Sequence, residues 1–111
     1  AFSCGGSPWF MEVKGVTLDM DGTAMFPDAP TERGIRHLEG LAQAVKDGYG
    51  AAALFVIQMK GVHAFSPHRE RHLEFADALK KAKENGVHIW AYDCAVTDRS
   101  MKLDAPVPVI L

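Results

Sequence analysis

Two short segments near the start of the chain contain residue types that perform metal-dependent chemistry. In the first, Glu12, Val13 and Lys14 lie in a stretch where hydrophobic and polar residues nearly alternate. Residues two apart on a strand point the same way, so the Glu12 carboxylate and the Lys14 ammonium would share one face, about 7 Å apart along the chain. The carboxylate, helped by the Val13 carbonyl, could bind Mg²⁺, and the ammonium could activate water or stabilise a phosphate. Taken alone, the same residues fit an ion pair on a solvated strand better.

The second segment, residues 19–23, reads Asp-Met-Asp-Gly-Thr and resembles the nucleophile motif of haloacid-dehalogenase phosphatases. In that reading Asp19 attacks phosphorus, Asp21 is the general acid and base, and Mg²⁺ bridges them and the phosphate. The polar residues upstream do not suit a buried parallel strand, and the later strand carries one acid, Asp93, where a pair is needed. Asp21-Gly22 is also a strong hairpin-turn signal. A turn is therefore favoured over a phosphatase.

Composition limits what the whole chain can be. With 111 residues, 48% of them hydrophobic, it has enough apolar material for one modest domain with a single core. A formal charge of −2 excludes a protein that holds nucleic acid by bulk charge, so DNA contact would need a local basic face. Two isolated cysteines indicate a reducing, cytoplasmic setting. The chain has no apolar run of membrane-spanning length and no secretory leader, so we expect no membrane partner.

The hydrophobic pattern predicts alternating strands and helices. Residues 1–8 are rich in Gly, Ser and Pro and are expected to form a loop or the start of a fragment, with the domain proper over residues 9–111. The pattern predicts strands at 9–18, 23–26, 51–59, 87–96 and 101–103, helices from about 31 to 47 and 69 to 85, a loop at 60–68 and at best an edge strand at 107–111. This order gives an α/β fold, a mixed sheet flanked by helices.

Several segments together resemble the sugar fermentation stimulation protein A family. They are MEVKGVTL at 11–18, FPDAPTERGIRHLEGL at 26–41, GYGAAALFVIQM at 48–59, FSPHRE at 65–70, NGVHIWAYDCAV at 85–96 and PVPVIL at 106–111. The similarity runs from about Trp9 to the end of the chain. In that family the segment between the first two blocks is a variable hairpin, which agrees with a turn at Asp21-Gly22.

The resemblance implies a PD-(D/E)xK nuclease-like domain with a restriction-endonuclease-like core. Family members are similar to two-part proteins in which an OB-type barrel precedes this domain, and the present chain resembles the second part. The first acidic ligand of the family lies in an upstream Asp-Phe pair, and Ala1-Phe2 falls in nearly that region without the Asp. With one carboxylate fewer, weaker Mg²⁺ binding is expected.

Carried over residue by residue, the resemblance implies a site centred on Glu12, Val13 and Lys14. Glu12 and Val13 would bind Mg²⁺, Lys14 would activate water or phosphate, and Asp28 would be a second acid or a helix cap. Thr31, Arg33 and His37 would contact phosphate from the first two turns of the helix. The expected activity is DNA binding with Mg²⁺-dependent phosphodiester cleavage. The alternative is a non-enzymatic, DNA-binding regulator of sugar metabolism genes.

Overall fold

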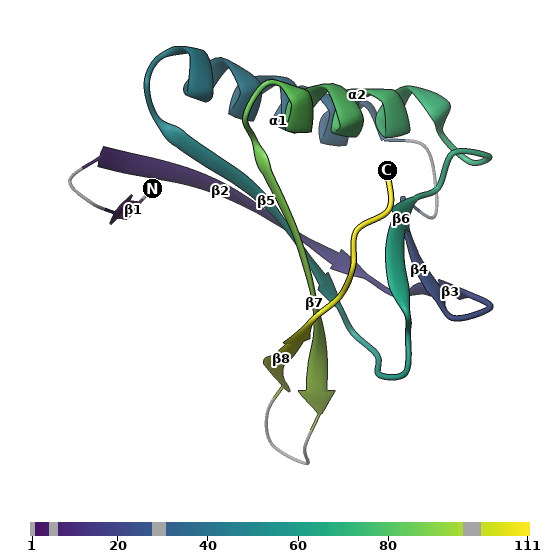
Figure 1. Ribbon diagram of the computed structural model, residues 1–111. Coiled ribbons are helices and arrows are strands. Elements are labelled where there is room, and N and C mark those ends of the chain that lie inside the picture. Colours follow the sequence, from purple (N-terminus) through teal and green to yellow (C-terminus); the bar gives the residue numbers. More distant parts are fainter. Residues whose placement is uncertain (1, 5–6, 28–30, 97–100) are drawn as a thin grey trace.

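The computed structural model describes residues 2–4, 7–27, 31–96 and 101–111, and Figure 1 shows how they are arranged. The elements are β1 (Phe2–Cys4), β2 (Ser7–Val16), β3 (Leu18–Met20), β4 (Thr23–Phe26), α1 (Glu32–Lys46), β5 (Gly50–Ile57), β6 (Ala64–Pro67), α2 (Leu73–Glu84), β7 (His88–Val96) and β8 (Met101–Pro106). Neither helix is both long and apolar enough to cross a bilayer, as judged over these residues.

The strands form two sheets. The larger has the order β1-β2-β5-β7-β8, with β2, β5 and β7 parallel to one another and the outer strands β1 and β8 antiparallel to their neighbours. The smaller has the order β3-β4-β6, in which β4 is antiparallel to β3 and parallel to β6. The predicted mixed α/β architecture is confirmed.

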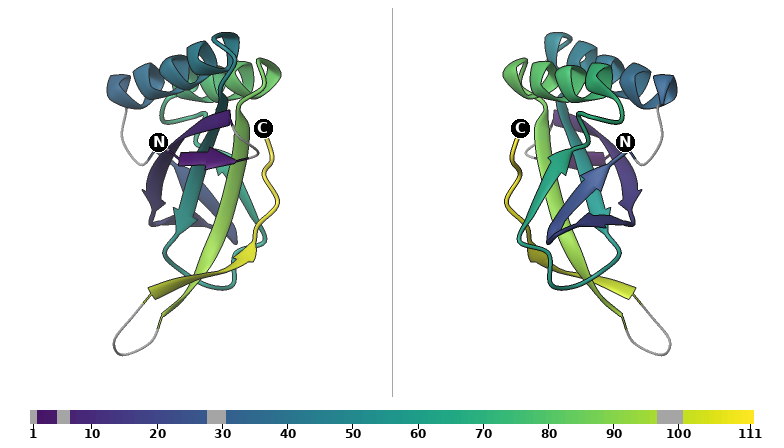
Figure 2. Two further views of the ribbon diagram at one scale, coloured as in Figure 1. Left: turned by 90° about the vertical axis from the view of Figure 1, so that its left-hand side faces the viewer. Right: turned by 90° about the vertical axis from the view of Figure 1, so that its right-hand side faces the viewer.

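Both helices lie side by side over one face of the larger sheet, as the two side views of Figure 2 show. On β5 the alternate residues Ala51, Ala53, Phe55 and Ile57 are buried in the same cluster as the apolar faces of the helices. Two alanines at these positions let α1 approach the strand closely, and the alternation follows from the pleat. The core is therefore a sandwich of sheet and helix pair.

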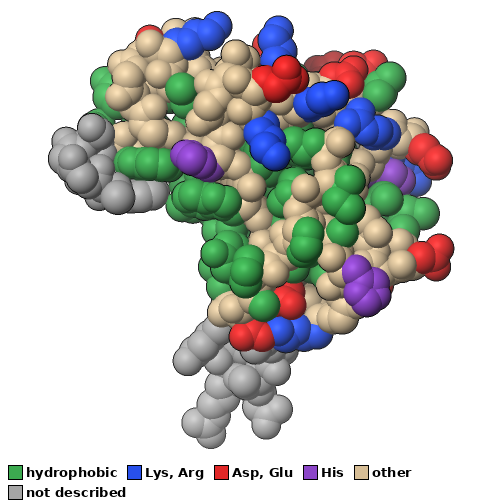
Figure 3. All heavy atoms as spheres, in the orientation of Figure 1, with side chains coloured by type: hydrophobic (Ala, Val, Ile, Leu, Met, Phe, Trp, Pro, Cys, Tyr) green, Lys and Arg blue, Asp and Glu red, His purple; other side chains and the backbone are tan. Residues whose placement is uncertain are grey.

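The opposite face of the larger sheet is more open. Trp9 on β2 and His88 and Trp90 on β7 stack there, with ring centroids 5.4 to 6.4 Å apart. Gly50 is needed beneath them, because a Cβ at this position would lie 2.3 Å from the Trp9 ring. Figure 3 shows charged side chains gathered over the helices and hydrophobic ones below them, over the strands.

Several predicted boundaries were wrong. The loop predicted at 1–8 contains β1, and β2 already begins at Ser7. The loop predicted at 60–68 contains β6. Both missed strands exist because a neighbouring strand supplies their hydrogen bonds, which local composition does not encode. The predicted strand at 9–18 ends at Val16, and residues 107–111 contribute one isolated bridge, from Val109 to Phe65.

Candidate functional site

Strand β2 presents Glu12 and Lys14 on the face that the helices cover. In the parallel pairing with β5, Glu12 is in register with Ala53 and Lys14 with Phe55, two residues of the helix-facing core. Val13 lies between them and its side chain is on the other face, 54% exposed. The predicted sharing of one face by the carboxylate and the ammonium is confirmed.

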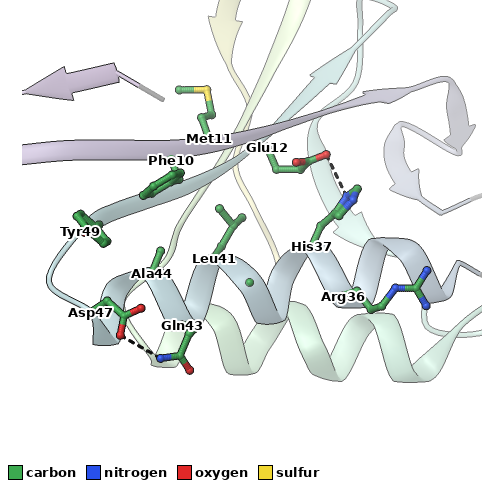
Figure 4. Close-up of a pocket in the computed structure, with 11 residues that line it drawn as sticks. Phe10, Met11, Glu12, Arg36, His37, Leu41, Gln43, Ala44, Asp47 and Tyr49 are labelled. Carbon is green, nitrogen blue, oxygen red and sulfur yellow. Dashed lines mark hydrogen bonds and ion pairs between the residues drawn. The ribbon is translucent and has the colours of Figure 1, made fainter.

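His37 on α1 completes a triangle with these two residues. The Lys14 Nζ lies 3.2 Å from the Glu12 Oε1, the His37 Nδ1 lies 3.0 Å from the same oxygen, and Nζ and Nδ1 are 2.8 Å apart. Figure 4 shows Glu12 and His37 pointing toward each other across the gap between β2 and α1. One ring nitrogen cannot serve both partners at once: protonated, it donates to Glu12, and unprotonated, it accepts from Lys14. The triangle can therefore hold a proton in two arrangements.

The three side chains are partly shielded but reachable from solvent. Their exposed fractions are 34% for Glu12, 20% for Lys14 and 28% for His37. Partial burial strengthens the interaction between charges relative to a fully exposed pair and still leaves a path for a substrate. A phosphate group could approach this cluster without any rearrangement of the core.

The Val13 carbonyl points away from β5. The neighbouring carbonyl of Val16 accepts a hydrogen bond of 2.9 Å from the backbone N–H of Gln58, on the β5 side of β2. Carbonyl directions alternate along a strand, so those of Gly15 and Val13 point to the opposite side. Among the described residues, the pairing of β1 with β2 extends no further than Trp9. Val13 thus offers a backbone oxygen at an edge of β2 that no described strand covers.

The remaining predicted site residues have mixed outcomes. Asp28 lies outside the described residues. Thr31 is the N-cap of α1: its Oγ1 accepts a 3.0 Å hydrogen bond from the Gly34 N–H, and its own N–H donates to His72 Nδ1 at 3.1 Å. Arg33 is exposed on the first turn. The structure brings His37, but not Arg33, into contact with Glu12 and Lys14.

The acidic segment at 19–23 forms the predicted turn. Asp21 and Gly22 have φ values of 55° and 90°, and the Asp19 Oδ1 accepts a 2.9 Å hydrogen bond from the Gly22 N–H. Glycine is required at position 22 for two reasons. Its φ is positive, and a Cβ there would lie 2.7 Å from the His63 ring. The turn joins β3 to β4 in the smaller sheet, whereas the phosphatase motif needs the end of a buried parallel strand.

A second polar cluster, which our sequence predictions did not include, lies where β7 meets β8. The ammonium of Lys60 contacts the carboxylates of both Asp93 and Asp104. The Asp93 Oδ1 also accepts a 2.9 Å hydrogen bond from the backbone N–H of Ala105, beside an irregularity in the pairing of the two strands. This backbone hydrogen bond is the largest cause that lowers the pKa of Asp93. Partial burial raises the pKa, and the Lys60 ammonium lowers it further. These contacts hold β8 against β7 at the edge of the larger sheet.

This cluster predicts a dependence of stability on pH. The pKa of Asp93 is lower in the folded chain than in the unfolded chain. The ionised carboxylate therefore stabilises the fold at any pH above the pKa that Asp93 has in the unfolded chain. That contribution should fade as the pH falls below about 4. We expect Asp93→Asn to lower the free energy of unfolding at neutral pH. The difference in free energy of unfolding between this variant and the wild type should become smaller as the pH falls. Urea denaturation at several pH values measures this difference, and a difference that does not change with pH would contradict the prediction.

A pocket of about 520 Å³ adjoins Glu12 and His37, between β2 and α1. Its lining includes the exposed aromatic rings of Phe10 and Tyr49, which meet edge to face with centroids 5.4 Å apart. At its far end the Gln43 Nε2 donates a 3.1 Å hydrogen bond to the Asp47 Oδ1. Our sequence predictions missed these residues, although the helical spacing of Arg36, Gly40, Ala44 and Asp47 beside His37 was a usable signal. The lining comprises Phe10, Met11, Glu12, Arg36, His37, Gly40, Leu41, Gln43, Ala44, Asp47 and Tyr49.

Comparison with known proteins identifies the family. The family model described as "Sugar fermentation stimulation protein RE domain", abbreviated SfsA, matches residues 2–100. The chain belongs to the SfsA family. The predicted family resemblance is therefore confirmed.

Among curated SfsA relatives, the homolog from Clostridium beijerinckii is 56% identical over 102 residues, which cover 92% of this chain and 45% of that protein. The homolog from Clostridium acetobutylicum is 49% identical over 106 residues, covering 96% and 46%. The homolog from Desulfitobacterium hafniense strain Y51 is 55% identical over 93 residues, covering 84% and 41%. The chain spans about half the length of these relatives.

The solved structure of Pyrococcus furiosus SfsA in complex with Ca²⁺ superposes with a TM-score of 0.84 and 29% sequence identity. The match covers 91% of this chain and 44% of that one. Together with the mixed sheet and paired helices, this likeness supports the predicted restriction-endonuclease-like fold.

Proposed function

We propose that this SfsA-family domain binds DNA and hydrolyses phosphodiester bonds with the help of a divalent cation. The contact among Glu12, Lys14 and His37 carries the proposal, since it joins an acid, a base and an ammonium on one accessible surface. The Ca²⁺ complex of Pyrococcus furiosus SfsA supports a divalent cation as the partner.

The donor set fits a cation that binds together with nucleic acid. Within the described residues no cluster of three His, Cys, Asp or Glu side chains is placed to hold a metal ion. Mg²⁺, however, is commonly held by one or two carboxylates, several waters and substrate phosphates. Glu12 would supply the carboxylate, the Val13 carbonyl a further oxygen, and Asp28 a second acid. The chemistry that such a cation supplies is polarisation of the phosphate and a lower pKa of the attacking water.

The side chains around Glu12 would donate hydrogen bonds and stabilise negative charge during the reaction. The Lys14 ammonium would donate a hydrogen bond to the attacking water or to a phosphate oxygen, where negative charge grows in the transition state. His37, protonated at Nδ1, would donate to the Glu12 Oε1 and hold the carboxylate in place. The exposed guanidinium groups of Arg33 and Arg36, near the N-terminal end of α1, would contact flanking phosphates.

A second candidate is a DNA-binding regulator without hydrolytic activity. One observation favours it: the Lys14 ammonium lies 3.2 Å from the Glu12 carboxylate and already neutralises it. A cation would have to displace this contact or share the carboxylate with it. DNA binding through Arg33 and Arg36 needs no such exchange.

Incubating the protein with supercoiled plasmid DNA separates these functions. For a nuclease we expect nicking with Mg²⁺ or Mn²⁺ and none with EDTA, because the proposed step requires the cation. Glu12→Gln should abolish nicking, since it removes the charged oxygen donor. Gel electrophoresis of the plasmid measures the outcome.

Glu84→Gln is the matched control, because Glu84 is exposed at the end of α2 and should leave nicking unchanged. Retardation of DNA without any cleavage would support the regulator. Nicking that persists in EDTA, or in Glu12→Gln, would contradict the proposed site.

A further inference from the structure

The pocket beside the candidate site has a composition that suits one part of a nucleic acid. It opens directly onto Glu12 and His37, which belong to its lining, and it runs along α1 to Asp47 and Tyr49 (Figure 4). At about 520 Å³ it falls in the size range of small-molecule sites. A group bound there would therefore be joined to whatever occupies the candidate site.

Exposed aromatic rings form one wall of the pocket. Phe10 is 39% and Tyr49 41% exposed, and their interplanar angle of 79° leaves one ring presenting its edge and the other its face. Two adjacent exposed aromatic rings on a pocket wall give an apolar surface on which a planar ligand can stack. Stacking on such a ring is how single-stranded nucleic acid is commonly held, whatever its sequence.

The carboxylate at the far end of the pocket disfavours a phosphate at that position. Asp47 is exposed, and its carboxylate offers hydrogen-bond acceptors and no donor. Gln43 donates one of its two amide N–H groups to Asp47, and its amide oxygen is a second acceptor beside the remaining N–H. A phosphate would be repelled here, whereas the exocyclic amino group of a base can donate to these oxygens.

We propose that this pocket binds an unstacked nucleobase of the same strand whose phosphate lies at Glu12, Lys14 and His37. The base would stack against Tyr49 and Phe10 and donate its amino group to Asp47, so cytosine is preferred over uracil. This inference rests on the proposed function and adds a single-stranded substrate and a base preference to it.

Fluorescence anisotropy with short labelled oligodeoxycytidine and oligodeoxyuridine, in Ca²⁺ buffer, tests the proposal. The two bases differ in the one exocyclic group that would face Asp47. We expect the wild type to bind oligodeoxycytidine about tenfold more tightly, the size of one charge-assisted hydrogen bond. Asp47→Asn should bring the ratio close to one, because an amide can donate to uracil as well as accept from cytosine. Tyr49→Ala should lower the affinity for both oligonucleotides by the same factor.

Asp77→Asn is the matched control, since Asp77 is an exposed carboxylate on α2, outside the pocket lining. Equal binding of the two oligonucleotides by wild type, or a ratio that survives in Asp47→Asn, would overturn the base pocket. If plasmid nicking is intact in that case, only this inference fails. If the wild type binds neither oligonucleotide and also leaves plasmid DNA unshifted and intact, the proposed function fails with it.

Discussion

Lys14→Ala is expected to lower the rate of metal-dependent phosphodiester cleavage by about 100-fold or more, the effect typical of removing one group that stabilises charge in a transition state. The Lys14 ammonium is the group of the candidate site best placed to meet a developing negative charge, because it contacts both Glu12 and His37 and is 20% exposed. Its loss should appear in kcat, since the contact it makes with a phosphate strengthens only during the reaction.

Binding of the cation should respond differently from cleavage. Removing the ammonium frees the Glu12 carboxylate of a competing positive charge, so affinity for a divalent cation should stay the same or rise. Isothermal titration with Ca²⁺ beside a cleavage assay with Mg²⁺ separates the two effects. A variant that lost cation binding and cleavage together would show that Lys14 acts by positioning Glu12.

Lys80→Ala provides the matched control for Lys14→Ala. Lys80 is exposed on α2, and its replacement removes the same charge without touching the cluster. A loss of cleavage equal in both variants would point to general electrostatic attraction of DNA, which increases with lower salt for every lysine. Unchanged cleavage in Lys14→Ala would leave this residue as an ion-pair partner of Glu12 and nothing more.

The parts of the site that lie close together in sequence were predictable. A period of two along β2 was enough to place Glu12 and Lys14 on one face. The Asp21-Gly22 pair indicated its own turn, and Gly48 and Gly86, both with positive φ, mark where the helices end. Each of these features depends on backbone preferences over a few residues, which the sequence expresses directly.

The parts that depend on distant contacts were not predictable in the same way. His37 meets Lys14 across 23 positions of sequence, and its helical spacing alone paired it with Arg33 instead. Strand β6 is four residues long and exists because β4 pairs with it. The pocket requires the angle at which α1 crosses β2, and that angle is set by packing over the alanines of β5.

Phe55→Ala should have the largest effect on stability, a loss of roughly 3–5 kcal/mol in the free energy of unfolding. Phe55 on β5 is 1% exposed, and its ring stacks on Phe65 of β6 at 4.4 Å and meets Phe26 of β4 at 5.6 Å. Phe26 in turn contacts Phe75 of α2 at 5.3 Å. Phe55 therefore joins the two sheets, and Phe26 extends the aromatic cluster to α2. Removing the Phe55 ring leaves a cavity that no single element can close.

Urea denaturation measures this loss, and Leu103→Ala is the control, because Leu103 is 50% exposed on β8 and should cost less than about 1 kcal/mol. A domain of this size has a total stability of about 5–15 kcal/mol, so Phe55→Ala would consume much of it. Phe55 is also in register with Lys14 on the neighbouring strand. A cavity there would loosen β2 beneath the candidate site, so cleavage should weaken with stability. A loss below about 1 kcal/mol would mean that the aromatic cluster repacks and that the two sheets are held together elsewhere.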